Sequence, residues 1–194
     1  MNFLAHSLFT NSDELLVVGQ YCGDFVRGGN LQQFPPTVQH GISLHRRIDS
    51  YTDSHPVNLL ARNLFSKPYR RFAGIITDVL YDHFLAQNWQ EFSNISLQSH
   101  AEFVYGALQA HFDLLPPDLQ RFVTVVIERN ALVSYLDVTT VEQVLERISR
   151  RSQRFEILAT AGKPMRENYS ELRGCFDEFF PDLVEHVDPY ISTA

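Results

Sequence analysis

The sequence predicts an all-α protein that folds as one compact helical domain over residues 1–194. Apolar residues recur at spacings of three and four in most parts of the chain, which is the period of a helix with one buried face. Glycine and proline residues lie mostly between these periodic segments. With 194 residues, 44% of them hydrophobic, the chain is long enough to close one sizeable core.

The first two helices are expected at about residues 2–9 and 12–27. Ser12 is expected to cap the second helix, and the glycines that begin at Gly28 are expected to end it. A third helix covers about residues 36–51, and a fourth begins at Pro56, because proline suits the first turn of a helix. Further helices are expected at about 68–88, 97–114, 117–135, 140–158 and 165–187, with Pro181 as a candidate break in the last one.

The net charge of −7 is unevenly distributed along the chain. Residues 1–90 hold seven basic and seven acidic residues, whereas residues 91–194 hold nine basic and sixteen acidic ones. Five of the eight histidines lie in the first part. The sequence shows no basic stripe interleaved with aromatic residues, so general nucleic-acid binding is not expected. A local basic patch remains compatible with this distribution.

Two cysteines, Cys22 and Cys175, lie far apart, and neither is part of a CxxC motif. A disulfide scaffold and a thiolate zinc site are therefore not expected. The sequence has no basic N-terminal region followed by a cleavage site, and no run of about 18 uncharged apolar residues. We therefore expect a cytoplasmic protein without a secretion signal or a membrane span.

Two ionisable side chains of the third expected helix lie on its apolar face. His45 and Asp49 are one helical turn apart on a wheel of about 100° per residue. Near the N-terminus, His6 lies between Phe3 and Phe9 in a short and mostly apolar helix. These three side chains are therefore predicted to point inward.

Other ionisable side chains lie in the 68–88 helix and in the segment around residue 24. His83 falls within the apolar arc of that helix, Asp82 lies at its edge, and Asp78 lies just past it. Asp24 follows a glycine, which lets the backbone approach a neighbour closely. A buried carboxylate is costly unless it is paired or bound to a metal.

These seven residues support two interpretations. Neutral imidazole and carboxylate groups are suitable ligands for Mn²⁺, Mg²⁺ or Fe, so together they could form one metal site. A single inward histidine is more often a core residue with a satisfied hydrogen bond, and the acidic residues could instead pair with arginines. The arginines available for this are Arg46, Arg47, Arg70 and Arg71. Spacing alone does not name a reaction.

The inward residues fall within four longer stretches of the first 90 residues. The stretches are MNFLAH at 1–6, GDFVRG at 23–28, GISLHRRIDSYTDSHP at 41–56 and RRFAGIITDVLYDHFL at 70–85, followed by Trp89. In this order and spacing they are similar to the acyl carrier protein phosphodiesterases, also called ACP hydrolases. Residues 91–194 have the expected length and helical character but carry no motif of this family.

The resemblance implies an enzyme that removes the 4′-phosphopantetheine arm from holo acyl carrier protein. Water would cleave the phosphodiester to the carrier's serine and leave the apo protein, with a divalent cation, Mn²⁺ or Mg²⁺, as cofactor. It also implies an all-helical fold like that of the HD-domain phosphohydrolases. The chain departs from the usual HD pattern, because it contains no His-Asp dipeptide. Its nearest substitutes are His45 with Asp49 and the reversed pair Asp82–His83.

The resemblance also suggests roles for the acidic residues. We expect the metal to be bound by Asp24, His45 and Asp78. Asp49 and Asp82 would be either further ligands or residues that orient the ligands. The absence of a His-Asp dipeptide leaves this ligand set open.

Two further roles fall to the histidines and arginines. His6 or His83 is the expected general acid or base, because imidazole titrates near neutral pH. Arg46 or Arg47 could bind the phosphate with two parallel hydrogen bonds, although an exposed solubilising charge explains either residue equally well.

The implied partner, acyl carrier protein, is acidic, so an enzyme with a net charge of −7 needs a local basic surface to bind it. The candidate residues for this surface are Arg27, Arg62, Lys67, Arg70 and Arg71. The alternative for Arg71 is a buried ion pair with the acidic residues that follow it in the same helix.

Two other functions remain open at this stage. A small-molecule phosphohydrolase, for example one that acts on nucleotides, could use the same metal site. A non-catalytic helical binding module could instead hold its inward acidic residues in ion pairs with arginines. A small-molecule phosphohydrolase would not act on the holo carrier. A non-catalytic binding module would not bind a metal.

Overall fold

A computed structural model describes residues 2–28 and 31–191 of the chain. In these ranges it contains α-helices and short 3₁₀ helices and no strand, so the predicted all-α class is confirmed. The core side chains of the described part form one continuous hydrophobic cluster that draws on helices from both ends of the chain. None of the described helices is both long and apolar enough to cross a membrane.

The helices of the first half, in chain order, are α1 (Phe3–Leu8), α2 (Glu14–Cys22), α3 (Pro36–Ser54), α4 (Pro56–Asn63), η1 (Tyr69–Phe72), α5 (Ala73–Gln87) and α6 (Trp89–Phe92). Those of the second half are α7 (Leu97–Ala110), η2 (Phe112–Leu114), α8 (Pro117–Glu128), α9 (Ala131–Ser134), α10 (Val138–Ser149), η3 (Gln153–Thr160), α11 (Gly162–Glu167) and α12 (Tyr169–Ile191).

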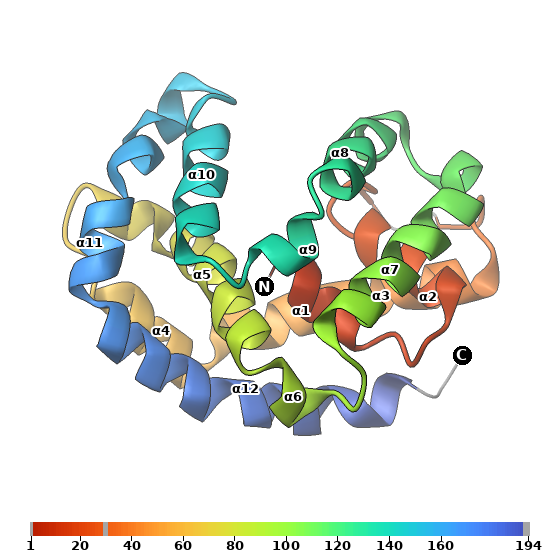
Figure 1. Cartoon of the computed structure of the whole chain (residues 1–194), viewed down its shortest axis with the longest axis horizontal. Coiled ribbons are helices and arrows are strands. Elements are labelled where there is room, and N and C mark those ends of the chain that lie inside the picture. The colour runs from red at the N-terminus through yellow and green to blue at the C-terminus, as the bar shows by residue number, and fades with distance from the viewer. Residues whose placement is uncertain (1, 29–30, 192–194) are drawn as a thin grey trace.

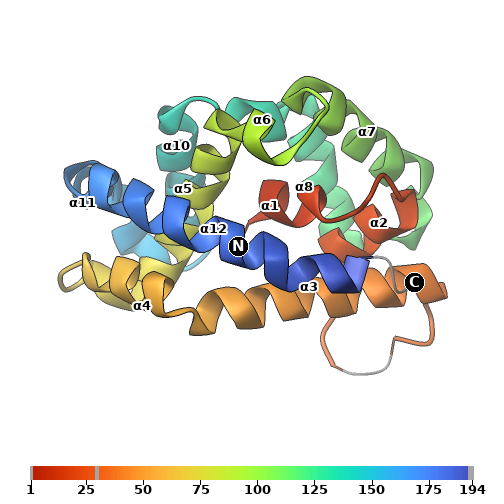
Figure 2. The ribbon, with the colours of Figure 1, turned by 90° about the horizontal axis from the view of Figure 1, so that it is seen from below.

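The short helix α1 lies in the middle of the molecule (Figures 1 and 2). It packs against α5 and α2. The long helix α12 runs along one side of the molecule and contacts α3, α4 and α5 (Figure 2). The two helices that carry most of the inward polar residues of the first half, α3 and α5, are therefore held from one side by α12 and meet α1 at the centre.

Helices α2 and α3 approach each other closely because both carry a glycine at the crossing. A Cβ atom on Gly19 would lie 2.5 Å from the carbonyl oxygen of Val38 and 2.7 Å from the Cα of Gly41. Any larger residue would force the two backbones apart. Since His45 lies one turn beyond Gly41 on α3, this crossing sets how close its imidazole comes to α2.

Several expected boundaries were wrong; for example, the expected 140–158 helix ends at Ser149. The N-cap of α2 is Asp13, whose carboxylate accepts hydrogen bonds from the N–H groups of Leu15 and Leu16, while Ser12 lies before it with a φ of 58°. The same helix ends at Cys22, well before residue 27. The expected 117–135 helix is divided at Asn130, which adopts a left-handed conformation with a φ of 45°.

The expected break near Pro181 does not occur. Helix α12 continues through both Pro181 and Pro189 to Ile191. Burial of apolar side chains on both sides of Pro181, such as Phe179, Phe180 and Leu183, offsets the backbone hydrogen bond that proline removes.

Candidate active site

Three side chains from the middle of the molecule bring their ligand atoms together. His6 on α1 and His45 and Asp49 on α3 each offer one nitrogen or oxygen atom, and these atoms lie within 4.8 Å of one another. The Nε2 atom of His6 is 3.2 Å from Oδ1 of Asp49, and the Nε2 atom of His45 is 3.1 Å from Oδ2. The two imidazole rings are stacked, with centroids 3.9 Å apart. Among residues 2–28 and 31–191, no other His, Cys, Asp and Glu side chains form such a group.

Asp24 adds a fourth polar side chain at the edge of this group. It lies just after α2, and its Oδ1 atom is 3.4 Å from Nε2 of His45. Its neighbour Gly23 makes this approach possible, because a Cβ atom there would lie only 2.2 Å from Cγ of His45. The Asp24 carboxylate is more than half exposed, whereas both imidazoles are buried. We refer to His6, Asp24, His45 and Asp49 as the central cluster.

The two histidines of the central cluster carry different charges at neutral pH. Burial, followed by the charge of His45, lowers the pKa of His6 to about 4, so His6 is neutral at pH 7. Burial also acts to lower the pKa of His45, but its contacts with Asp24 and Asp49 outweigh burial and raise the pKa to about 9. Burial would raise the pKa of Asp49, yet the neighbouring imidazoles hold it far below its ordinary value. Burial acts to raise the pKa of Asp24 as well, but its contact with His45 lowers it, so both carboxylates of the cluster are ionised at neutral pH.

The nitrogen atoms of His45 have unusual surroundings. Neither Nδ1 nor Nε2 makes a hydrogen bond of good geometry with any described residue, although both atoms are buried. Nε2 instead lies between the carboxylates of Asp24 and Asp49 without aligning with either of them. Buried polar atoms are normally hydrogen-bonded, so this arrangement suggests a site that receives a further group.

Gln20 is a member of the site that the sequence did not reveal. It lies on α2, is almost fully buried, and places its Oε1 atom 3.1 Å from Nδ1 of His6. The Oε1 atom of Gln20 can only accept a hydrogen bond, so it selects the tautomer of neutral His6 in which the Nδ1–H group donates. The Nε2 atom then presents its lone pair beside the ionised Asp49, an arrangement that a cation between the two would stabilise. The available signal was a single glutamine within the apolar run of residues 15–22.

Asp82 and His83 lie on α5 but make other contacts. The Asp82 carboxylate is fully buried and accepts hydrogen bonds from the backbone N–H groups of Leu4 and Ala5, at 2.9 and 3.1 Å. Burial raises its pKa to about 7, although these two N–H groups act to lower it. Asp82 therefore holds the first turn of α1, and with it the backbone that carries His6.

His83 is bound through both of its ring nitrogens. Nδ1 lies 2.6 Å from the carbonyl oxygen of Tyr135, and Nε2 lies 2.7 Å from the hydroxyl group of Tyr169. These partners come from the second half of the chain and do not belong to the central cluster. Of the two histidines expected to act as acid or base, the structure brings only His6 to the cluster.

Asp78 lies on α5, one turn before Asp82, and is half-buried. Burial raises its pKa, and the charge of Asp49 adds to this effect. Its carboxylate is therefore within electrostatic reach of the cluster. It does not belong to the group of ligand atoms within 4.8 Å.

The arginines on α3 have structural contacts. Arg46 donates hydrogen bonds to the carbonyl oxygens of Val26 and Gly28 and so fixes the loop that follows Asp24. The guanidinium of Arg47 lies over the ring of Tyr190 on α12. Their expected role in binding phosphate stays a prediction.

The candidate partner-binding residues lie outside the cluster. Arg62 on α4 pairs with Asp53, so it is not a free surface charge. Arg70 donates to the side chain of Asn63, and the guanidinium of Arg71 lies against the ring of Phe72. The remaining candidates, both exposed, are Arg27 and Lys67. The expected alternative of a buried Arg71 is wrong, because Arg71 is exposed.

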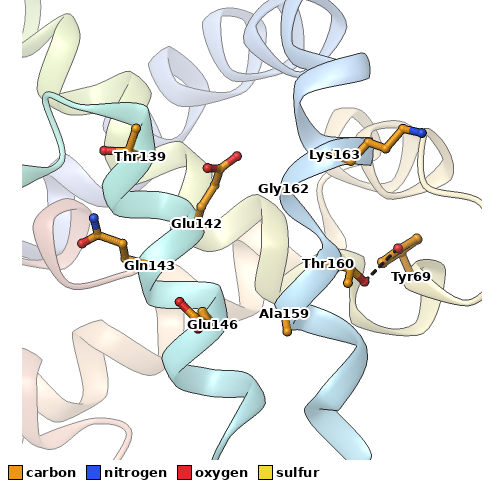
Figure 3. Close-up of a pocket in the computed structure, with 9 residues that line it drawn as sticks. All are labelled: Tyr69, Thr139, Glu142, Gln143, Glu146, Ala159, Thr160, Gly162 and Lys163. Atoms are coloured by element: carbon orange, nitrogen blue, oxygen red, sulfur yellow. Dashed lines mark hydrogen bonds between the residues drawn. The ribbon is translucent and has the colours of Figure 1, made fainter.

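A separate surface groove of about 630 Å³ lies between α10 and the segment formed by η3 and α11 (Figure 3). Two carboxylates line it, Glu142 and Glu146, and each has an arginine partner. The lining contains hydroxyl groups and a lysine but no histidine or cysteine. The groove therefore lacks the imidazole ligands of the central cluster, and its carboxylates are already paired, so we do not place the active site there.

Comparison with known proteins identifies the family. Residues 1–183 match the family described as acyl carrier protein phosphodiesterase. A protein named acyl carrier protein phosphodiesterase from Photorhabdus laumondii is 32% identical over 189 residues, which cover 97% of this chain and 96% of that protein. A protein of the same name from Escherichia coli O6:H1 is 35% identical over 189 residues, which cover 95% of this chain and 96% of that protein. No solved structure matches the chain, so the likeness to HD-domain phosphohydrolases stays a prediction. The chain belongs to the acyl carrier protein phosphodiesterase family.

Proposed function

We propose that the protein hydrolyses the phosphodiester that joins 4′-phosphopantetheine to the serine of holo acyl carrier protein. Water supplies the new oxygen on phosphorus, the bond between phosphorus and the serine oxygen breaks, and the serine oxygen takes up a proton. The products are apo acyl carrier protein and free 4′-phosphopantetheine. The observation that carries this proposal is the central cluster, in a chain whose relatives bear the name of this reaction.

We propose a divalent cation, Mn²⁺ or Mg²⁺, as the cofactor, held by His6, His45 and Asp49 with Asp24 as a further oxygen ligand. Two imidazole nitrogens and ionised carboxylates are a suitable donor set, and Nε2 of His45 lies between two carboxylates without a well-aligned hydrogen bond to either. When bound, such an ion polarises the phosphoryl group and lowers the pKa of a water molecule. His45 would lose its proton on binding the ion, since a ligating imidazole is neutral.

The chain's own residues supply the remaining chemistry. His6 is neutral at pH 7, so the lone pair of its Nε2 atom is available to a cation without loss of a proton. Asp49 faces both imidazoles and keeps their Nε2 atoms directed toward the same point. Asp24 is the most exposed carboxylate of the cluster, at 56% against 36% for Asp49.

The proposed partner is a protein, the holo acyl carrier protein, as the names of the relatives indicate. Free Cys22 and Cys175 are compatible with a reducing compartment, so we propose the cytoplasm as the location. Because both proteins are acidic, docking requires a basic surface on the enzyme.

The test is incubation of the protein with holo acyl carrier protein and Mn²⁺, followed by the intact mass of the carrier. We expect the carrier to lose the mass of the phosphopantetheine group. A carrier of unchanged mass would contradict the proposed activity, and hydrolysis of nucleotides in the same sample would support a small-molecule phosphohydrolase. Full conversion after exhaustive treatment with a chelator would contradict the proposed cofactor.

A further inference from the structure

We propose that the outward face of α4 is the surface on which the acidic carrier protein docks. Leu59 and Leu60 would make the apolar contact, and neighbouring basic side chains would meet the carboxylates of the carrier. This proposal rests on the proposed function, because it names the partner of that same active site. The basic side chains concerned are Lys67, Arg70 and Arg71.

The apolar part of this surface is an unusual feature of α4. The helix buries Val57, Asn58 and Ala61, and its opposite face presents two leucines in succession. Leu59 is 48% exposed and Leu60 is 63% exposed. The other large hydrophobic side chains exposed in the described ranges each stand alone in the sequence. An adjacent pair of exposed leucines gathers apolar surface in one place, and contiguous apolar surface is what marks contacts with a partner.

The leucine pair lies within a segment that carries basic residues and no acidic one. Residues 54–77 hold four basic residues and no acidic one, in a chain whose net charge is −7. Arg70 donates a hydrogen bond of 2.6 Å to Oδ1 of Asn63. Asn63 follows Leu60 by three residues and therefore shares its side of the helix. One basic group is thus held directly beside the leucines, and Lys67 and Arg71 are exposed in the segment that follows.

The position of α4 also suits delivery of the substrate to the cluster. Helix α3 carries His45 and Asp49 and ends at Ser54, and α4 begins at Pro56 (Figure 2). Arg62 of α4 pairs with Asp53, which lies one helical turn beyond Asp49. A carrier bound on α4 would therefore have its flexible phosphopantetheine arm next to the helix that carries the cluster.

Charge complementarity favours the carrier as the occupant. An apolar pair with basic side chains beside it matches an acidic protein surface, and the opposite charges raise the rate of encounter. A second copy of this chain is a poorer match, because a symmetric dimer through this face would place the same basic side chains against each other.

The test compares Leu60→Glu with the control Leu136→Glu, which changes a leucine of 49% exposure between α9 and α10. Initial rates with holo carrier give kcat and KM, and fluorescence anisotropy gives the Kd for labelled apo carrier. We expect Leu60→Glu to raise KM and Kd about tenfold or more with little change in kcat, and the control to behave as wild type. Arg70→Glu should raise KM at low salt and lose this effect at high salt, whereas the effect of Leu60→Glu should persist.

The outcomes separate the docking surface from the activity. A Leu60→Glu variant with the KM and Kd of the wild type contradicts docking on α4. A wild-type protein that binds the carrier but does not change its mass contradicts the activity alone. Gel filtration of the free wild-type protein as a dimer that Leu60→Glu converts to a monomer would assign the face to a second copy and also contradict the proposal.

Discussion

His6 and His45 come from different helices, yet their rings stack with centroids 3.9 Å apart and both Nε2 atoms face the carboxylate of Asp49. Two stacked imidazoles are stable together only when at most one is charged. The low pKa of His6 and the raised pKa of His45 meet this condition. The stacked arrangement also requires close backbone packing around His45, which the glycine at position 23 allows.

Gly23→Ala should impair activity without removing any ionisable group. A Cβ atom at this position would lie 2.2 Å from Cγ of His45, so the imidazole must move away from Asp24. We expect a fall in kcat of at least about tenfold for a displacement of this kind. The control is Gly106→Ala, where nothing lies within 4 Å of the added atom. Equal kcat values for the two variants would show that the position of His45 is not critical.

Gln20→Leu should weaken metal binding while the fold is retained. The substitution removes the acceptor for Nδ1 of His6, which fixes the lone pair of Nε2 toward the cluster. Loss of such a partner typically lowers metal affinity about 10- to 100-fold. Titration of Mn²⁺, followed by the electron paramagnetic resonance signal of the free ion, measures the affinity. Gln20→Glu retains an acceptor and should restore binding; a Gln20→Leu variant with wild-type affinity would refute this role.

Asp82→Ala should lower the free energy of unfolding. Its carboxylate accepts the N–H groups of Leu4 and Ala5, and the substitution would leave both groups buried without this partner. The cost is about 1–3 kcal/mol for each unsatisfied group. Urea unfolding followed by circular dichroism measures the change. If the free energies of unfolding of the wild type and Asp82→Ala differ by less than about 0.5 kcal/mol, water or another group replaces the carboxylate as the acceptor.

Stability should fall as the pH decreases below about 6.5, partly because of His100. Burial lowers the pKa of this residue in the folded protein to about 4, and its Nε2 atom contacts the hydroxyl group of Ser7. Between the ordinary pKa and about 4 the unfolded chain binds the proton more readily, so acid favours unfolding.

The His100→Gln variant tests this expectation. The free energy of unfolding of the wild type and of this variant would be measured at about pH 7 and about pH 5. We expect a smaller loss of stability on acidification in the variant, even if it is less stable at neutral pH. Identical losses in the two proteins would assign the acid sensitivity to other groups, such as His6.

The sequence predicted features that depend on local periodicity. His45 and Asp49 were expected on one buried face of a helix, and the structure brings them together there. Neighbouring positions on a helix are set by geometry within one element, which a wheel represents well.

Contacts between distant elements could not be predicted in this way. A wheel indicates that a side chain is buried but not what it meets. Asp82 was expected near the metal and instead holds the backbone of α1, and His83 binds Tyr135 and Tyr169 from beyond residue 90. Gln20 was missed because glutamine on a helix is usually a solvent-exposed residue.

The central claim is that the cluster around Asp49 removes phosphopantetheine from the carrier. The most direct measurement is the intact mass of holo acyl carrier protein after incubation with Asp49→Asn and Mn²⁺, beside the wild type and the exposed control Asp118→Asn. We expect the wild type and Asp118→Asn to convert the carrier to its apo mass, and Asp49→Asn to leave it unchanged while its circular dichroism spectrum stays helical. Conversion by Asp49→Asn at the wild-type rate would contradict the account.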